Sequence, residues 1–220
     1  SNRLNNFAKR KIKFDHADKM DDVKALVKNE LGKFLDYIEK QNTNFYSYRD
    51  YLNACQYLGL DMNEEKNRYP HDFKRWHDIR IDEYRSAKAL KDEQERKEFY
   101  DKFAAVANKY LGLEYDKKSA YMSIIAKNPS ELITEGNALH HCVGRMNYDQ
   151  KFAREETLIF FIRMKENPEV PFVTIEYSPS QKRVLQCYGD NDTKPEDSVI
   201  EFVHKKWLPY ANRKLKQLAA

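Results

Sequence analysis

The chain has 220 residues, of which 41% are hydrophobic and 13% aromatic, so it is long and apolar enough to bury a core and is not disordered. It contains neither a secretory signal nor an apolar run of the roughly 18–20 residues that span a bilayer, which excludes a membrane partner. The odd count and wide spacing of its three cysteines suggest no disulfide framework and favour a cytoplasmic setting, and the lack of a CxxC pair excludes a four-cysteine zinc site. Its net charge of +4 permits contact with nucleic acid without requiring it.

The first sixteen residues are rich in basic side chains, namely Arg3, Lys9, Arg10, Lys11 and Lys13. We predict a basic arm or linker over residues 1–16. Such an arm can contact phosphates, fray, or connect to a preceding domain. The opening at Ser1 suggests that the chain begins partway into a longer protein.

Residues 17–112 form a predicted helical region. Apolar residues recur at intervals of three and four over residues 20–40, which predicts one amphipathic helix. A second helix is predicted to begin with Ser47 as its N-cap and to end at Gly59.

A third helix is predicted to begin near Pro70, which suits a first helical turn. The charged stretch after it forms either one very long helix or two helices that join near Lys91. The pattern changes after Gly112: residues 121–125 are typical of a strand, and residues 130–136 of a short helix.

Residues 113–220 form a predicted α+β domain. Three β-rich runs with short turns between them predict an antiparallel meander over residues 157–163, 171–177 and 183–188. A last helix is predicted over residues 198–218, with a kink at Pro209. The predicted fold class is therefore α+β: an N-terminal helical region, then a small three-stranded antiparallel sheet flanked by helices.

The segment from Asn137 to Gly144 holds the strongest candidates for chemistry. Two adjacent imidazoles, His140 and His141, precede the thiol of Cys142. These groups can bind a metal, transfer a proton or attack an electrophile. The segment is predicted to be a short helix or a tight turn, and its side chains could equally be buried for structural reasons.

Polar side chains alternate along the last two predicted strands. If their hairpin turns near Ser180, Thr174 lies opposite Gln186 and Glu176 lies opposite Val184, so Thr174, Glu176 and Gln186 share one face. The other face is apolar and comprises Val173, Ile175, Leu185 and Cys187. The polar face is either solvated, as is common in antiparallel sheets, or buried with partners for its carboxylate.

Three kinds of chemistry fit these residues. Cys142 could be a nucleophile beside an imidazole, with Gln186 stabilising an oxyanion, although adjacent side chains diverge. The histidines, Cys142 and Glu176 could hold a divalent metal of unknown identity. His141 could be a general acid–base that Glu176 orients. The catalytic candidates are His141, Cys142, Glu176 and Gln186, and the binding candidates are His140, Arg163, Thr174 and Asn191.

Several motifs of the C-terminal half occur together in one known family. They are Gly136-x-x-Leu139-x-His141-Cys142-Val143, Tyr148, Ile162-Arg163, Pro171-x-x-Thr174-Ile175-Glu176 and Gln186-x-x-Gly189-x-Asn191. On these motifs, residues 115–210 resemble the PcfJ-like family of bacterial conjugative plasmids, integrated mobile elements and phages. The helical half joins the resemblance through Tyr69-Pro70 to His77-Asp78. One departure is Cys187, which stands where a basic residue is expected, so a phosphate contact by this strand is less favoured.

The resemblance implies a bacterial, cytoplasmic protein of mobile DNA, and it implies no established catalytic mechanism. Two classes of function follow. The chain could be a binding component of a transfer complex, with nucleic acid or protein partners, or it could be a hydrolase or nuclease. We favour the binding component, because no complete catalytic template is visible. Convergence of His141, Glu176 and Gln186 in one concave pocket would favour the enzyme.

Overall fold

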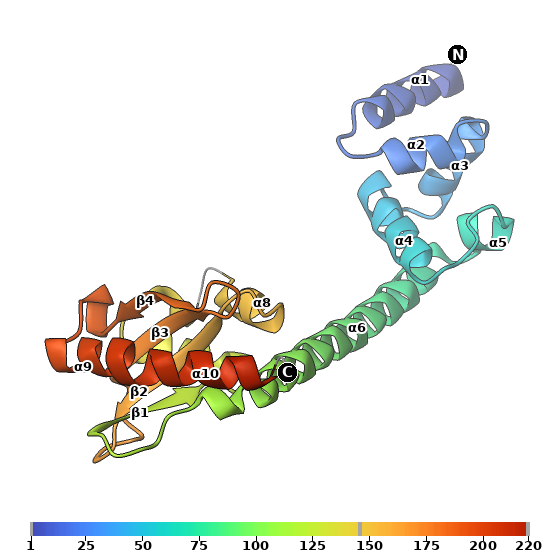
Figure 1. Ribbon diagram of the computed structural model, residues 1–220. Coiled ribbons are helices and arrows are strands. Elements are labelled where there is room, and N and C mark those ends of the chain that lie inside the picture. The colour runs from blue at the N-terminus through green and yellow to red at the C-terminus, as the bar shows by residue number, and fades with distance from the viewer. Residues whose placement is uncertain (1, 145–146, 219–220) are drawn as a thin grey trace. The chain divides into compact units, whose positions relative to one another are not determined.

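The chain folds into two compact units, each with its own hydrophobic core (Figure 1). We refer to residues 1–94 as the helical unit and to residues 95–220 as the α+β unit. The computed structural model describes residues 2–144 and 147–218. Within these described residues, no helix is both long enough and apolar enough to cross a membrane.

The basic segment at the start of the chain is an α-helix. Its helix α1 is held because Phe14 is buried, at 2% exposure, and because Arg10 forms ion pairs with Asp36 and Glu39. The limits predicted for the arm, the helical region and the α+β domain stay a prediction. The helical unit consists of α1 (Asn2–Asp15), α2 (Asp21–Val27), α3 (Leu31–Lys40), α4 (Phe45–Tyr57), α5 (Glu65–Arg68) and the first part of α6 (Phe73–Lys109).

The single helix predicted over residues 20–40 is wrong, because α2 ends at Val27 and α3 begins at Leu31. The break lets two short helices turn their apolar faces into one core. Val23 of α2 and Phe34 of α3 both have 0% exposure in that core. A straight helix of this length would leave part of its apolar face in water.

Two other helix starts differ from the predicted ones. Asn44 is the N-cap of α4, since its side chain accepts a hydrogen bond from the Ser47 N–H at 2.9 Å. Pro70 lies before α6, which begins at Phe73. From there α6 continues without interruption to Lys109, so the charged stretch forms one long helix.

Four tyrosines of the helical unit have a raised pKa, and burial is the largest cause in each case. They are Tyr37, Tyr48, Tyr51 and Tyr69. The unfolded chain loses these protons near the usual tyrosine pKa of about 10, while the folded chain still holds them. We therefore expect the contribution of these four phenols to the free energy of unfolding to be constant below about pH 10 and to fall as the pH rises further.

Urea unfolding followed by circular dichroism at about pH 8 and about pH 11 measures this loss. The variant Tyr48→Phe, which removes one titrating phenol from the core, is expected to show a shallower dependence on pH. A urea midpoint that does not change over this range would contradict the prediction.

The α+β unit confirms the predicted fold class, with four strands in place of three. Its sheet has the order β1-β2-β3-β4 and is antiparallel throughout. Its helices and strands are the end of α6, η1 (Leu111–Leu113), β1 (Tyr121–Ile125), α7 (Pro129–Ala138), η2 (Cys142–Gly144), α8 (Tyr148–Ala153), β2 (Leu158–Met164), β3 (Val173–Ser178), β4 (Arg183–Tyr188), η3 (Asp190–Asp192), α9 (Asp197–Glu201), η4 (Phe202–Trp207) and α10 (Leu208–Leu218).

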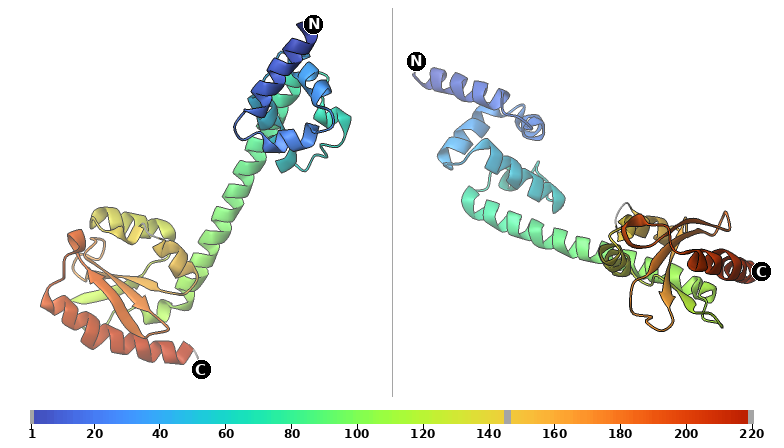
Figure 2. Two further views of the ribbon diagram at one scale, coloured as in Figure 1. Left: turned by 90° about the horizontal axis from the view of Figure 1, so that it is seen from above. Right: turned by 90° about the vertical axis from the view of Figure 1, so that its left-hand side faces the viewer.

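Helices cover both faces of this sheet, with α7 and α8 on one side and α10 on the other (Figure 2, left). The face of the sheet that α10 covers is the apolar one. There Trp207 packs edge-on against Phe160 and Tyr177, and its indole N–H donates to the Leu113 carbonyl at 3.1 Å. The opposite face is the one that carries the polar side chains of β3.

The register between β3 and β4 differs from the predicted one. Glu176 lies opposite Gln186, and Thr174 lies opposite Tyr188, with a bulge between Glu176 and Tyr177. The predicted polar face nevertheless keeps its members, because the shift is by two residues and side chains alternate with a period of two. The hairpin expected near Ser180 is present, since β3 ends at 178 and β4 begins at 183.

The helix predicted over residues 198–218 consists of three consecutive parts. The π-helical turn η4 separates α9 from α10 and ends two residues before Pro209. A proline ring clashes with the carbonyl four residues earlier in a regular α-helix, and wider local geometry relieves that clash. Trp207, at the end of η4, is fully buried.

Candidate functional site

A left-handed residue directs the candidate segment into the fold. The helix α7, which Asn128 caps by accepting the Glu131 N–H at 3.1 Å, ends at Ala138. His140 then adopts a φ of 51°, and the His141 N–H donates to the Gly136 carbonyl at 3.1 Å. The chain turns sharply, which places His141 and Cys142 in the wall of one pocket. The adjacent side chains were predicted to diverge, and this turn brings both to the same cavity.

Two glycines allow the backbone of this turn to pack directly on α7. A Cβ on Gly136 would lie 2.9 Å from the Gly144 nitrogen, and a Cβ on Gly144 would lie 2.7 Å from the Ile133 Cα. Side chains at either position would push the turn away from the helix. The positions of His141 and Cys142 therefore depend on this close approach.

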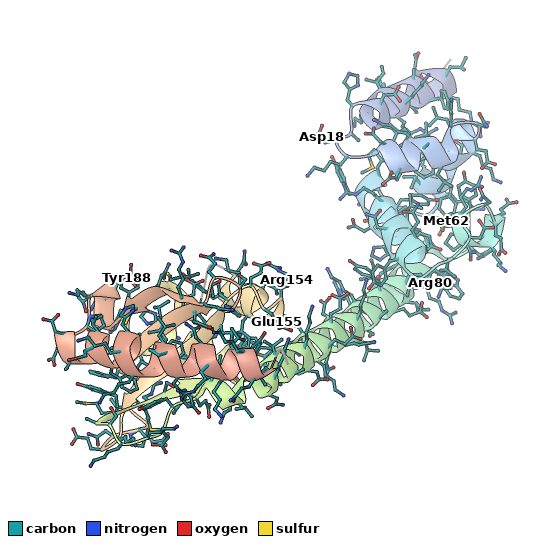
Figure 3. All side chains as sticks on the ribbon, viewed as in Figure 1. Asp18, Met62, Arg80, Arg154, Glu155 and Tyr188 are labelled. Carbon is teal, nitrogen blue, oxygen red and sulfur yellow. The ribbon has the colours of Figure 1, made fainter. Side chains whose placement is uncertain are left out.

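All four predicted catalytic residues line one pocket on the polar face of the sheet. The cavity has a volume of about 20 Å³, which is roughly the space of one water molecule. Tyr188, which lies at the end of β4 (Figure 3), contributes to its wall. Its lining consists of His141, Cys142, Val143, Tyr148, Ile159, Thr174, Glu176, Gln186, Tyr188 and Asp192.

A chain of buried polar contacts extends from His141 into the protein. The His141 Nε2 lies 3.1 Å from the Thr174 Oγ1, and the Thr174 hydroxyl donates to the Glu135 Oε1 at 3.2 Å. Arg163 forms a two-pronged ion pair with the same Glu135 carboxylate, with one N–H···O distance of 2.9 Å. Thr174 is thus the hydrogen-bond partner of His141 in place of the predicted Glu176. Arg163 was predicted to be a binding residue. It lies beneath the pocket, and its guanidinium is paired with the Glu135 carboxylate.

Tyr148 connects the thiol side of the pocket to β4. Its hydroxyl donates to the Gln186 Oε1 at 3.1 Å and also contacts the Cys142 thiol. Burial, and then the charge of the nearby Glu176, raise the pKa of Tyr148 to about 12. The phenol therefore remains a hydrogen-bond donor at neutral pH and fixes the orientation of the Gln186 amide, whose NH₂ group stays available to a ligand.

Glu176 is a buried carboxylate in the pocket wall. It is 6% exposed and lies between Ile159 on β2 and Gln186 on β4. Among the described residues, no hydrogen bond or ion pair to its side chain is found. A buried carboxylate without a protein partner is costly, so its position facing the cavity indicates a functional use more than a structural one.

His140 and Asn191 lie at the rim of the site. The His140 Nδ1 lies 2.7 Å from the Asp190 Oδ1, and the Asn191 N–H donates to the Leu139 carbonyl at 2.8 Å. The bond with His140 is the largest cause of the lowered pKa of Asp190. These contacts hold the loop after β4 against the end of α7, and the hollow beside them is lined by His140 together with His141 and Cys142.

The predicted metal site has no complete ligand set in the described part of the chain. No group of three His, Cys, Asp or Glu side chains lies close enough there to hold a metal ion together. His141 and Glu176 reach the same pocket, but Thr174 rather than a ligand cluster orients the imidazole.

Glu135 is the main site residue that the sequence reasoning missed. It is 2% exposed, although it stands in a short helix with polar neighbours. A signal was present: Leu132, Gly136 and Leu139 share its helix face, so Glu135 interrupts an apolar stripe. Tyr148, Tyr188 and Asp192 were also not proposed as site residues.

The fold and the site together define an α+β protein with a small pocket on the polar face of a four-stranded antiparallel sheet. Residues 47–201 match the model of a family described as PcfJ-like protein, and the chain belongs to this PcfJ-like family. The match includes about half of the helical unit as well as the pocket, so it extends further toward the N-terminus than the motif resemblance.

A relative from Listeria innocua serovar 6a, named "Uncharacterized protein Lin1253/Lin1744", is 31% identical over 186 residues. The alignment covers 84% of this chain and 39% of the relative, so the chain spans about two fifths of that protein's length. No solved structure matches the chain.

Proposed function

We propose that the α+β unit is a hydrolase in which His141 is the general acid–base and Glu176 stabilises its protonated form. The observation that carries the proposal is the convergence of His141, Cys142, Glu176 and Gln186 in one concave pocket. Scattered or densely packed side chains would have favoured a purely structural cluster. The enzyme is thus preferred over the binding component that the sequence alone favours.

The charge of the pocket favours an uncharged scissile group, such as an ester or amide. Its described lining includes the carboxylates Glu176 and Asp192 and no lysine or arginine, since Arg163 is beneath the surface and paired. A phosphodiester would meet repulsion from these carboxylates. A nuclease would need added positive charge at this site.

The proposed reaction gives one role each to His141, Gln186, Tyr148 and Glu176. His141 removes a proton from a water molecule, whose oxygen forms a bond to the carbonyl carbon of the substrate. The Gln186 NH₂ group, which Tyr148 orients, donates to the oxyanion as the carbonyl π bond opens. The bond to the leaving group then breaks, and the leaving group receives the proton from His141. Glu176 stabilises the protonated imidazole.

The test measures hydrolysis of p-nitrophenyl acetate and bis(p-nitrophenyl) phosphate by the full chain. We expect turnover of the acetate and not of the phosphodiester, and a loss of about 100- to 10,000-fold in His141→Asn, as is usual for removal of a general acid or base. The rate should also fall in Glu176→Gln, which removes the charge that stabilises the imidazolium. The matched control is His204→Asn, because His204 is an exposed histidine of the same unit outside the pocket.

Equal rates in His141→Asn and in the control would show that His141 has no part in the reaction. Turnover of the phosphodiester alone would replace the proposed substrate class with that of a nuclease. Each variant is compared with the wild type by its unfolding midpoint, so that a loss of fold is not read as a loss of chemistry.

The second candidate is a nucleic-acid-binding component of a mobile-DNA transfer complex in the bacterial cytoplasm. It is supported by membership of the PcfJ-like family and by the exposed basic side chains of α1. Fluorescence anisotropy with a labelled DNA oligonucleotide tests it: binding should weaken with salt and in the triple variant Lys9→Glu, Lys11→Glu, Lys13→Glu. Binding that ignores both changes would reject this role for α1.

A further inference from the structure

The buried contacts beneath the pocket have a fixed direction of proton donation. Arg163 can only donate, and it donates to both oxygens of the Glu135 carboxylate and to the Ile162 carbonyl. Glu135 is ionised in this pair and can only accept. The side chains are 9% and 3% exposed, respectively, so water does not replace these partners.

The next contact determines where the single hydroxyl proton of Thr174 lies. The Thr174 Oγ1 is 3.2 Å from the Glu135 Oε1, and two oxygens at this distance repel each other unless one carries a proton toward the other. Because Glu135 has no proton to give, Thr174 donates to it. Only lone pairs of the Thr174 oxygen then remain for the imidazole.

The last contact determines the tautomer of His141. Its Nε2 lies 3.1 Å from the Thr174 Oγ1, so the ring must donate from Nε2. We infer that Arg163, Glu135 and Thr174 hold His141 in the Nε2–H tautomer and leave Nδ1 as the proton acceptor of the site. Glu135 is thereby a positioning residue, and its catalytic meaning rests on the proposed function.

This arrangement differs from an isolated buried ion pair, because hydrogen bonds connect the pair to the pocket. Thr174 is 7% exposed and His141 is half-buried, so the chain ends at the cavity wall. A neutral imidazole in water exchanges between two tautomers, and a fixed acceptor–donor chain removes that freedom. The acceptor nitrogen is therefore ready before a substrate binds.

Nitrogen-15 NMR of the full chain with labelled histidine tests the inference at a pH about two units above the usual histidine pKa of about 6.5. The chain has six histidines, and the His141→Asn spectrum assigns the signal of interest. We expect a single Nε2–H tautomer for His141 and a visible, slowly exchanging Nε2–H proton. Thr174→Val should abolish that proton signal and give a mixture of tautomers, whereas Thr174→Ser should retain the wild-type pattern.

The Nδ1–H form of His141 in the wild type would overturn the inference, and so would an unchanged proton signal in Thr174→Val. If Thr174→Val does not fold, the wild-type and Thr174→Ser spectra still decide the tautomer. The readout needs no turnover, so an inactive protein with the Nε2–H tautomer would reject the hydrolase and support this inference. An active protein with the other tautomer would do the reverse.

Discussion

Replacement of Arg163 by methionine is expected to lower the free energy of unfolding of the α+β unit by about 3–5 kcal/mol. The variant leaves the Glu135 carboxylate buried, at 2% exposure, without its cationic partner. The remaining Thr174 hydroxyl cannot compensate a full charge in a medium of low polarity. The large effect comes from the unpaired carboxylate that stays buried and not from the stabilisation that the intact ion pair provides.

Urea unfolding followed by tryptophan fluorescence measures this loss. The chain has two tryptophans, and Trp207 is fully buried in the α+β unit, while Trp76 belongs to the helical unit. A Trp76→Phe background therefore makes the signal specific for the unit of interest. Such a reporter avoids treating two units as one transition.

Two further variants separate charge from packing. Arg183→Met is the matched control, because Arg183 is exposed on β4 and bonds only to the nearby Gln181 among the described contacts. It is expected to change stability by less than about 0.5 kcal/mol. Adding Glu135→Leu to Arg163→Met should restore much of the loss, since it removes the orphaned carboxylate. A loss below about 1 kcal/mol in Arg163→Met would show that Glu135 finds another partner.

The sheet could be predicted to a large extent from the sequence because its strands carry strong local signals. The run from Leu158 to Met164 is nearly all β-branched, aromatic or aliphatic, and it forms β2. The place of β1 could not be read in this way. Its residue Tyr121 pairs with Met164, and such a distant pairing depends on tertiary packing that no local pattern encodes.

The helical unit shows how tertiary packing overrides a good periodic pattern. Residues 20–40 have the spacing of one helix, yet the chain breaks between Val27 and Leu31 so that two apolar faces share a core. The cap of α4 was misplaced by three residues, because both Asn44 and Ser47 are good capping residues. Neither choice can be settled without the neighbouring helices.

The candidate site was predictable in its members and not in its connections. Alternation along β3 correctly placed Thr174 and Glu176 on one face, because a register shift of two preserves the faces. The partner of His141 was not predictable, since Thr174 stands 33 residues after it and lies on a strand. A bulge between Glu176 and Tyr177 also moved every pair beyond it.

Replacement of Gly144 by alanine is expected to disturb both the stability and the site, with a loss of about 1–3 kcal/mol. The added Cβ would lie 2.7 Å from the Ile133 Cα and 2.9 Å from the Leu132 carbonyl oxygen. Both neighbours belong to the backbone of α7, so no flexible side chain can move aside. The turn that carries His141 and Cys142 must shift instead.

Trp207 fluorescence in the Trp76→Phe background measures the stability, and the p-nitrophenyl acetate assay measures the displacement of the site. The control is Gly112→Ala, because a Cβ at Gly112 has nothing within 4 Å among the described atoms. That variant should be neutral or slightly stabilising, since alanine reduces the freedom of the unfolded chain.

Since α7 supplies Glu135 and the turn supplies His141, the strain in Gly144→Ala should also broaden the His141 Nε2–H signal. Equal stability of the two alanine variants would mean that α7 and the turn can separate without a loss of stability. The packing of the turn on α7 would then not fix the position of the His141 imidazole.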